Sequence, residues 1–229
     1  MNTKMIIVLL AAVLFIYPVQ ILAADANSSG TKDVNSAAEL KNIELPKPQM
    51  EGGKPLMVVL KERKTSREFS SEKLSLQVLS NMLWAACGVN REDGKRTAPT
   101  ALNKQEIDVY VAMEDGLYLY DAQANTLVGV LAGDIREATG KQPFVKVAPV
   151  NLVFVADYAK MANMPADQQD FYAATDTGFI SQNVYLFCAS EGLATVVRGY
   201  VDKAACQAAM KLRSDQKVIL AQTVGYPKK

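Results

Sequence analysis

The chain has 229 residues, of which 25 are Lys or Arg and 24 are Asp or Glu, and it contains no His. The resulting net charge of +1 gives no electrostatic basis for binding nucleic acid. The absence of His excludes His-based catalytic triads, His metal ligands and His general bases. Any chemistry must therefore rest on other side chains or on a cofactor.

The first 26 residues have the form of a secretory signal peptide. Lys4 supplies a positive charge, residues 5–16 are apolar, Pro18 interrupts the run, and residues 24–26 offer a small-residue cleavage site. A membrane anchor is the alternative, although the apolar run is short for a span. No Cys follows the run and no Arg pair precedes it, so neither lipid attachment nor export as a folded protein is indicated. We expect an exported, periplasmic protein that is cleaved after Ala26.

The rest of the chain divides into an arm and a domain. Residues 27–54 are rich in Ser, Asn, Lys and Pro and show little apolar periodicity, which predicts a linker or an extended arm. Residues 55–229 are enough for one domain with a substantial core.

Apolar spacing predicts the first elements of this domain. Ser75 is an N-cap candidate for a helix whose apolar face ends before Gly88. Alternating apolar residues predict a half-buried strand at 107–113. Residues 117–120 and 126–131 predict a hairpin around the polar segment between them.

The second half of the domain mixes strands and helices. A nearly continuous apolar run at 150–155 predicts a strand covered on both faces. A long helix is predicted at 167–191, where a glycine ends it, and a shorter helix at 203–212 begins after Asp202. Residues 218–224 predict the last strand. The mixed order indicates an α+β protein.

The three cysteines lie in apolar segments. Cys87 closes the first predicted helix, Cys188 lies in the long helix, and Cys206 lies in an Ala-rich helix. No Cys-x-x-Cys pair is present, so we favour three small buried side chains. A bridge between Cys188 and Cys206 is the alternative in an exported chain.

A cluster of cations and hydroxyls opens the domain. Three basic residues and two hydroxyl residues lie within residues 63–67, and Phe69 follows. Arg supplies a planar fork of donors, Lys a point charge and Thr or Ser a short donor, so the cluster suits a phosphate. A solvated turn after a helix is the alternative interpretation.

Four stretches in order resemble the nitroreductase family of flavin enzymes. The pattern Arg-x-[Ser/Thr]-x-[Arg/Lys]-x-Phe at residues 63–69 resembles that family's opening motif. The segment that reads Val-Tyr-Val and then Gly-Leu-Tyr-Leu-Tyr-Asp, residues 109–121, is most similar to the SagB-type, thiazole/oxazole dehydrogenase branch. The three other stretches that complete this order are 96–105, 176–199 and 225–228, and the segment at 109–121 indicates the branch alone. The resemblance implies the nitroreductase fold, a central antiparallel-rich sheet flanked by helices, and a homodimer whose sites lie between the subunits.

The resemblance also implies FMN as the cofactor. Carried over position by position, the first motif would contact the phosphate, the ribityl chain or the pyrimidine edge, and a later Asn-x-Gln pair would lie beside the ring. Backbone amides after the Gly-Leu turn would contact flavin N5, and a C-terminal basic residue would lie near the phosphate. In this chain these positions are Arg63, Lys64 and Thr65, then Asn103 and Gln105, then Val197, Arg198 and Gly199, and finally Lys228.

Two departures from the SagB-type pattern bear on function. No Lys-Tyr pair occurs between residues 157 and 176, and Phe179 stands where a His is common. These departures put azole formation on a peptide in doubt. The resemblance implies an FMN-dependent oxidoreductase that transfers hydride to or from a small organic molecule. The alternatives are a non-catalytic protein that binds a flavin or another small ligand and an exported protein without flavin. No protein acid or base is assigned, and no metal is expected.

Overall fold

The computed structural model describes residues 40–229, so the signal peptide expected at 1–26 and most of the expected arm lie outside the described residues. The strands are β1 (Ile43–Glu44), β2 (Ile107–Ala112), β3 (Gly116–Asp121), β4 (Thr126–Ala132), β5 (Val150–Asp157), β6 (Ala194–Arg198) and β7 (Gln216–Gly225). The helices are α1 (Leu56–Glu62), α2 (Leu76–Cys87), α3 (Phe144–Val147), α4 (Ala166–Glu191) and α5 (Lys203–Ala209).

A single antiparallel sheet organises the described chain. Its strand order is β1-β4-β3-β2-β5-β7-β6, and every neighbouring pair is antiparallel. All eight residues of β5 are buried, as the continuous apolar run at 150–155 predicts for a central strand. The α+β class and the antiparallel sheet expected from the sequence are confirmed.

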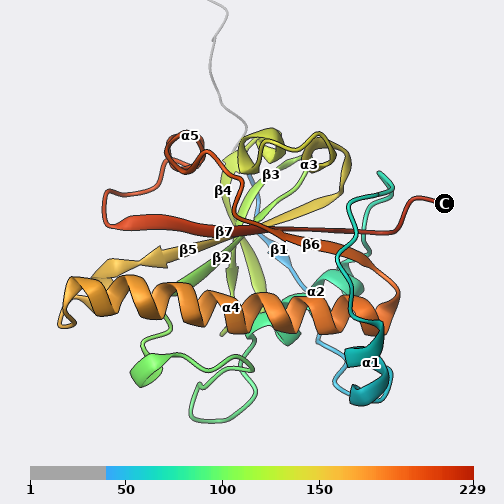
Figure 1. Ribbon diagram of the computed structural model, residues 1–229, viewed down its shortest axis with the longest axis horizontal. Coiled ribbons are helices and arrows are strands. Elements are labelled where there is room, and N and C mark those ends of the chain that lie inside the picture. The colour runs from blue at the N-terminus through green and yellow to red at the C-terminus, as the bar shows by residue number, and fades with distance from the viewer. Residues whose placement is uncertain (1–39) are drawn as a thin grey trace, which may run out of the picture. The chain divides into compact units, whose positions relative to one another are not determined.

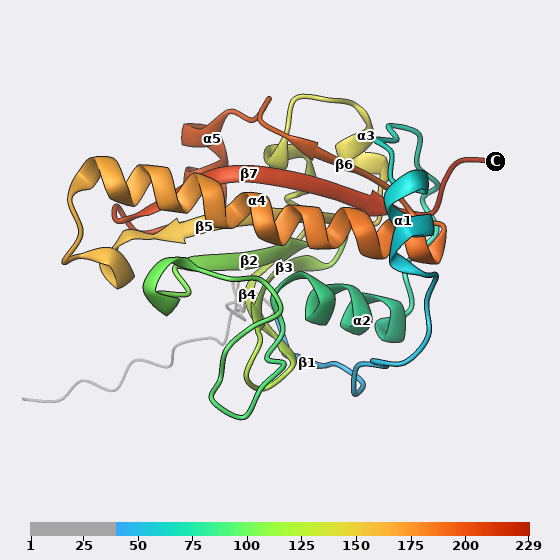
Figure 2. The same ribbon diagram turned by 60° about the horizontal axis from the view of Figure 1, so that its bottom comes forward.

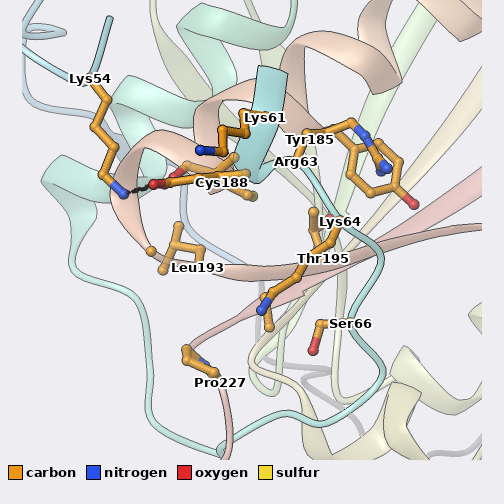
Figure 3. Close-up of a pocket in the computed structure, with 14 residues that line it drawn as sticks. Lys54, Lys61, Arg63, Lys64, Ser66, Tyr185, Cys188, Leu193, Thr195 and Pro227 are labelled. Carbon is orange, nitrogen blue, oxygen red and sulfur yellow. Dashed lines mark hydrogen bonds and ion pairs between the residues drawn. The ribbon is translucent and has the colours of Figure 1, made fainter. Parts of the chain in front are cut away.

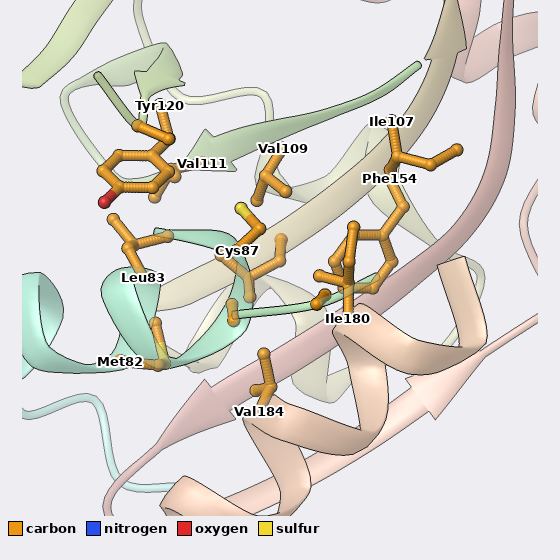
Figure 4. Close-up of a cluster of buried hydrophobic side chains, with 14 of the residues drawn as sticks. Met82, Leu83, Cys87, Ile107, Val109, Val111, Tyr120, Phe154, Ile180 and Val184 are labelled. Carbon is orange, nitrogen blue, oxygen red and sulfur yellow. The ribbon is translucent and has the colours of Figure 1, made fainter. Parts of the chain in front are cut away.

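Helices cover both faces of the sheet. The long helix α4 crosses one face beside α2, and α5 lies on the opposite face (Figures 1 and 2). The main core lies between the sheet and the α2–α4 layer, where Cys87, Phe154 and Ile180 meet (Figure 4). A second cluster beneath α5 includes Cys206 and Met210. Each large side chain buried in this way contributes about 1.5–3 kcal/mol to stability.

The helix boundaries follow their predicted signals. The hydroxyl oxygen of Ser75 accepts a hydrogen bond of 3.2 Å from the N–H of Val78, which caps α2. Gly192 ends α4 with φ 71°, a left-handed conformation that favours glycine. Asp202 caps α5 through the N–H of Ala205. The predicted helix at 203–212 is shorter in the structure, because α5 ends at Ala209.

Two edge strands carry no clear signal in the sequence. β6 forms by pairing with β7, and the two-residue β1 forms by pairing with β4. β1 belongs to residues 40–54, the described part of the expected arm. This part lies against its own domain, because the hydroxyl of Ser80 donates to Pro46 O and Asn81 Oδ1 accepts from Gln49 N at 2.9 Å.

Two further features concern the cysteines and the membrane. Cys87, Cys188 and Cys206 are all buried and unpaired, as the sequence favours. Burial raises the pKa of the Cys206 and Cys87 thiols to about 11. Within residues 40–229, no helix combines the length and the apolar character needed to cross a membrane.

Candidate functional site

The segment after α1 is held between the edge of the sheet and the C-terminal tail. Arg63 caps α1 by donating its N–H to Val59 O at 2.8 Å, and the chain then becomes extended. The N–H of Ser66 donates to Thr195 O of β6 at 2.9 Å, and Phe69 forms a β-bridge with Pro227. The predicted opening motif is therefore fixed beside β6.

A pocket of about 540 Å³ lies between this segment, α1 and the C-terminal end of α4 (Figure 3). Lys54 forms an ion pair of 2.7 Å with Glu62 at its rim. Three other cations line it, and in the described chain none of them has a carboxylate partner: Lys61, Arg63 and Lys64. The pocket therefore has an excess of positive charge, and it suits an anionic group such as a phosphate.

Tyr185 of α4 connects three parts of this site. Its hydroxyl lies 3.0 Å from Thr65 Oγ1 and accepts a hydrogen bond of 3.0 Å from the N–H of Val197. The guanidinium carbon of Arg63 lies 5.3 Å from the centre of the Tyr185 ring, within cation–π range (Figure 3). The structure thus brings three of the predicted site residues together around one side chain that the sequence analysis did not select.

The predicted C-terminal residue Lys228 lies next to the same segment. Its N–H donates to Glu68 O at 3.3 Å. Lys228 lines a second, more open hollow of about 710 Å³, and Pro227 and Gly192 line both hollows. Lys228 therefore lies beside the cationic pocket, although it does not line it.

Asn103 and Gln105 lie elsewhere. Neither residue lines the cationic pocket. Gln105 Nε2 donates to Gly94 O and to Asn103 Oδ1, both at 3.1 Å. The backbone here has positive φ at Leu102, Asn103 and Gln105, which side-chain-bearing residues adopt only under local constraint. Within one chain, this polar pair and the Arg63 segment form separate groups.

The predicted positions Arg198 and Gly199 lie at the last residue of β6 and directly after it. The Arg198 guanidinium is buried, and it donates to Thr139 O at 2.7 Å and to Asn151 Oδ1 at 3.1 Å. Burial lowers the pKa of Arg198 to about 10. The Arg198 side chain is therefore engaged within the fold, and its backbone is paired with Ala221 of β7. Gly199 is exposed at the end of β6.

A buried pair of carboxyl groups underlies the Asn103 loop. Glu106 is fully buried, and Asp176 of α4 is almost so. Burial first, and then the neighbouring carboxyl group of Asp176, raises the pKa of Glu106 to about 7. The pair therefore holds a proton up to about neutral pH.

The sequence analysis missed Tyr185, Lys61 and the Glu106–Asp176 pair. Tyr185 lies in an apolar helical stretch, where its type and spacing match those of a core residue. Lys61 precedes the motif, and no sequence pattern marks it as a site residue. The only available signal for the third group was a Glu directly before a strand of alternating apolar residues.

Comparison with known proteins identifies the family. The model of the Nitroreductase family matches residues 60–226. "Putative nitroreductase MJ1384" of Methanocaldococcus jannaschii is 34% identical over 167 residues, which are 69% of this chain and 84% of that protein. The crystal structure of a "putative nitroreductase" from Ralstonia eutropha JMP134 has a TM-score of 0.80 and 43% identity, with 84% of this chain and 92% of the other covered.

A more distant structure shares only the fold. The NADPH:FMN oxidoreductase from Vibrio harveyi, complexed with NAD⁺, has a TM-score of 0.57 at 18% identity, with 76% of this chain and 69% of the other covered. The family model covers most of the chain, and both closer relatives are nitroreductases by name. The chain belongs to the nitroreductase family.

Proposed function

We propose that this protein is an exported FMN-dependent oxidoreductase that transfers hydride between bound FMN and a small organic molecule. One observation carries the proposal: three cations without carboxylate partners in the described chain line one pocket, beside the motif that resembles an FMN-binding segment. In a member of this family, such unpaired positive charge can bind the phosphate of an anionic flavin cofactor.

The residues present fit the phosphate end of FMN. Arg63 offers a bidentate fork, and Lys64 and Lys61 add charge. Thr65 does not itself line the pocket, but it follows Lys64 directly and its exposed hydroxyl is a short donor. Bound FMN supplies reversible two-electron chemistry, including hydride transfer. The protein's part is to bind the anionic end and to orient the ring.

A homodimer completes this proposal. α4 exposes Phe171, 63% accessible, and Phe179, 44% accessible, and Leu102 beside the Asn103 loop is 79% exposed. Large apolar side chains exposed in this way are typical of a contact surface. Asn103 and Gln105 lie outside the pocket of their own chain, so we propose that each pocket is completed by that loop from a second copy.

We propose a small organic substrate rather than a peptide that is converted to an azole. The Lys-Tyr pair of the SagB-type pattern is absent, and exposed Phe179 stands at the position where a His is common. For an exported protein, NADH and NADPH are scarce, so we propose a partner redox protein as the electron donor.

Absorption of the purified protein tests this function. A yellow protein with flavin bands, bleached by dithionite and recovered by quinone or nitroaromatic acceptors with turnover, is the expected result. Flavin bands without turnover would favour the alternative, a non-catalytic flavin-binding protein. A colourless protein that takes up no added FMN would contradict both.

Mass measurement of the protein recovered from the medium or periplasm tests export. Cleavage after Ala26 is expected. An exported chain that retains Met1 would contradict the signal-peptide assignment.

A further inference from the structure

Tyr185 lines the proposed phosphate site, although the family resemblance assigns it no contact with the cofactor. Its side chain lines the pocket and is only 7% exposed, and its hydroxyl lies between the segment after α1 and the edge strand β6. We propose that Tyr185 is a positioning residue: its hydroxyl orients the Thr65 hydroxyl so that Thr65 donates a hydrogen bond to the phosphate of bound FMN. The inference rests on the proposed function and extends it to a residue that the resemblance does not assign to the site.

Chemistry fixes the direction of the hydrogen bond from Val197, and we assign the direction of the bond between the two hydroxyls. A backbone N–H can only donate, so the Tyr185 oxygen accepts from Val197. The phenol then has one hydrogen to donate, and Thr65 Oγ1, at 3.0 Å, is the acceptor that the described chain places within bonding distance. Since Thr65 Oγ1 accepts this bond, the Thr65 hydroxyl hydrogen is free for another acceptor. Among the described residues, no group accepts it.

The position of Thr65 indicates which acceptor that is. Thr65 directly follows Arg63 and Lys64, which line the pocket and have no carboxylate partner in the described chain. A phosphate held by these cations presents several acceptor oxygens, and hydrogen bonds to a charged acceptor are shorter and stronger than those between neutral groups. In this relay of hydrogen bonds, Val197 N–H donates to Tyr185, Tyr185 donates to Thr65, and Thr65 donates to the phosphate.

The ring and the hydroxyl of Tyr185 have separable roles. The ring lies under the Arg63 guanidinium at 5.3 Å. Tyr185→Phe keeps this contact and the buried ring, and it removes only the hydroxyl. Thr65 is exposed, so replacing it with Val tests the same relay at a position where folding is not at risk.

Affinity for FMN compared with riboflavin tests the proposal, because riboflavin lacks the phosphate. Fluorescence quenching gives both dissociation constants for the parent, Tyr185→Phe, Thr65→Val and the double variant. We expect each single variant to bind FMN about tenfold more weakly with riboflavin affinity nearly unchanged. The double variant should lose no more than either single one, because both break the same relay.

Two control variants separate this role from a structural one. Thr65→Ser keeps the hydroxyl and should retain the parent ratio of FMN to riboflavin affinity. Tyr172→Phe changes a tyrosine of the same helix that does not line the pocket, and it should also leave the ratio unchanged. A merely structural effect of Tyr185→Phe, such as loss of the partner of Val197, would weaken both flavins equally.

Each outcome has a definite meaning. An unchanged affinity ratio in Tyr185→Phe, or additive effects in the double variant, would overturn the positioning role and leave the flavin function intact. If Tyr185→Phe fails to fold, an unchanged ratio in Thr65→Val overturns the proposal alone. A parent protein that binds neither flavin would overturn the proposed function and this inference together.

Discussion

The Asp176 carboxylate accepts a hydrogen bond of 2.8 Å from the N–H of Ala101, and this contact connects the middle of α4 to the loop that carries Asn103 and Gln105. The loop backbone has positive φ at Leu102, Asn103 and Gln105. Such a strained conformation persists only where surrounding contacts hold it, and the hydrogen bond from Ala101 is one such contact. Asp176 is thus placed to maintain the conformation of a predicted flavin-contacting loop without itself touching the ligand.

Replacement of Asp176 should destabilise the protein through this loop. Asp176→Ala leaves the Ala101 N–H without an acceptor at a buried site, so we expect a loss of about 1–3 kcal/mol in the free energy of unfolding. Asp176→Asn keeps an oxygen acceptor of the same shape and should lose much less. Urea denaturation of the three proteins measures the difference. Equal stability of the Ala variant and the parent would show that this hydrogen bond does not support the fold.

The buried Glu106 predicts a fall in stability as pH rises. Burial and Asp176 raise the pKa of Glu106 in the folded protein to about 7, from 4.5 for an ordinary Glu. Between these values the folded chain holds a proton that the unfolded chain has released, so stability is lost as pH rises from about 4.5 through 7. The chain contains no His, so few other groups titrate in this window.

Denaturation at several pH values between 5 and 8 measures this effect. Glu106→Gln is neutral at every pH and should flatten the curve over that range. A parent protein whose stability is constant or rises between pH 5 and 8 would contradict the protonated state of Glu106. A Gln variant that keeps the full slope would assign the slope to other groups.

The sequence predicted those helices and strands that have a capping residue or an apolar pattern within their own segment. Ser75 and Asp202 cap the helices that they were expected to cap, and the apolar run of β5 is buried on both faces. β6 was missed because it is a short edge strand that forms only by pairing with β7, some 20 residues later in the chain. Long-range pairing of this kind has no local periodicity to reveal it.

The site was predictable only in part for the same reason. The cations at Arg63 and Lys64 are adjacent in sequence, so one motif contains both. Tyr185 lies 120 residues from Thr65, and its hydroxyl has a role only because α4 passes beside the segment after α1. Glu106 and Asp176 are also distant in sequence, and the raised pKa of Glu106 follows from burial beside Asp176. The sequence of a single chain contains no signal for such contacts.

The three thiols should be inert in the folded protein. Cys87, Cys188 and Cys206 are buried and unpaired, and burial raises the pKa of each thiol. Because the thiolate is the reactive form, we expect a thiol reagent to label none of them quickly in the native state and all three after unfolding. A reducing agent should leave the melting temperature nearly unchanged. A large drop on reduction would reveal a disulfide that stabilises the protein.

The proposed dimer can be tested on the exposed face of α4. Phe179→Asp places a charge where an apolar partner surface is expected, so light scattering should show monomers at concentrations where the parent is dimeric, and FMN affinity should fall with dissociation. Val130→Asp is the matched control, because Val130 is an exposed apolar residue on β4, away from α4. If Phe179→Asp remains as dimeric as the control, the contact surface lies elsewhere.

Arg63 should account for a large part of the affinity for FMN. Its guanidinium lines the pocket, lies over the Tyr185 ring and has no carboxylate partner in the described chain, so it is free to form two parallel bonds to a phosphate. Charge-assisted hydrogen bonds contribute about 1.5–3 kcal/mol, so Arg63→Ala should weaken FMN binding by about ten- to a hundredfold. Arg63→Lys should recover only part of this loss, because an ammonium group cannot reproduce the fork.

Two controls make the Arg63 measurement specific. Lys73→Ala also removes one positive charge, but Lys73 is exposed, pairs with Glu114 at 2.9 Å and does not line the pocket, so FMN affinity should hardly change. Circular dichroism should show that the Arg63→Ala apoprotein is folded, because the Tyr185 ring that Arg63 covers belongs to none of the hydrophobic core clusters of the described chain. An Arg63→Ala protein that binds FMN as tightly as the parent would place the phosphate outside this pocket, and the residues assigned around it would then have no part in holding the cofactor.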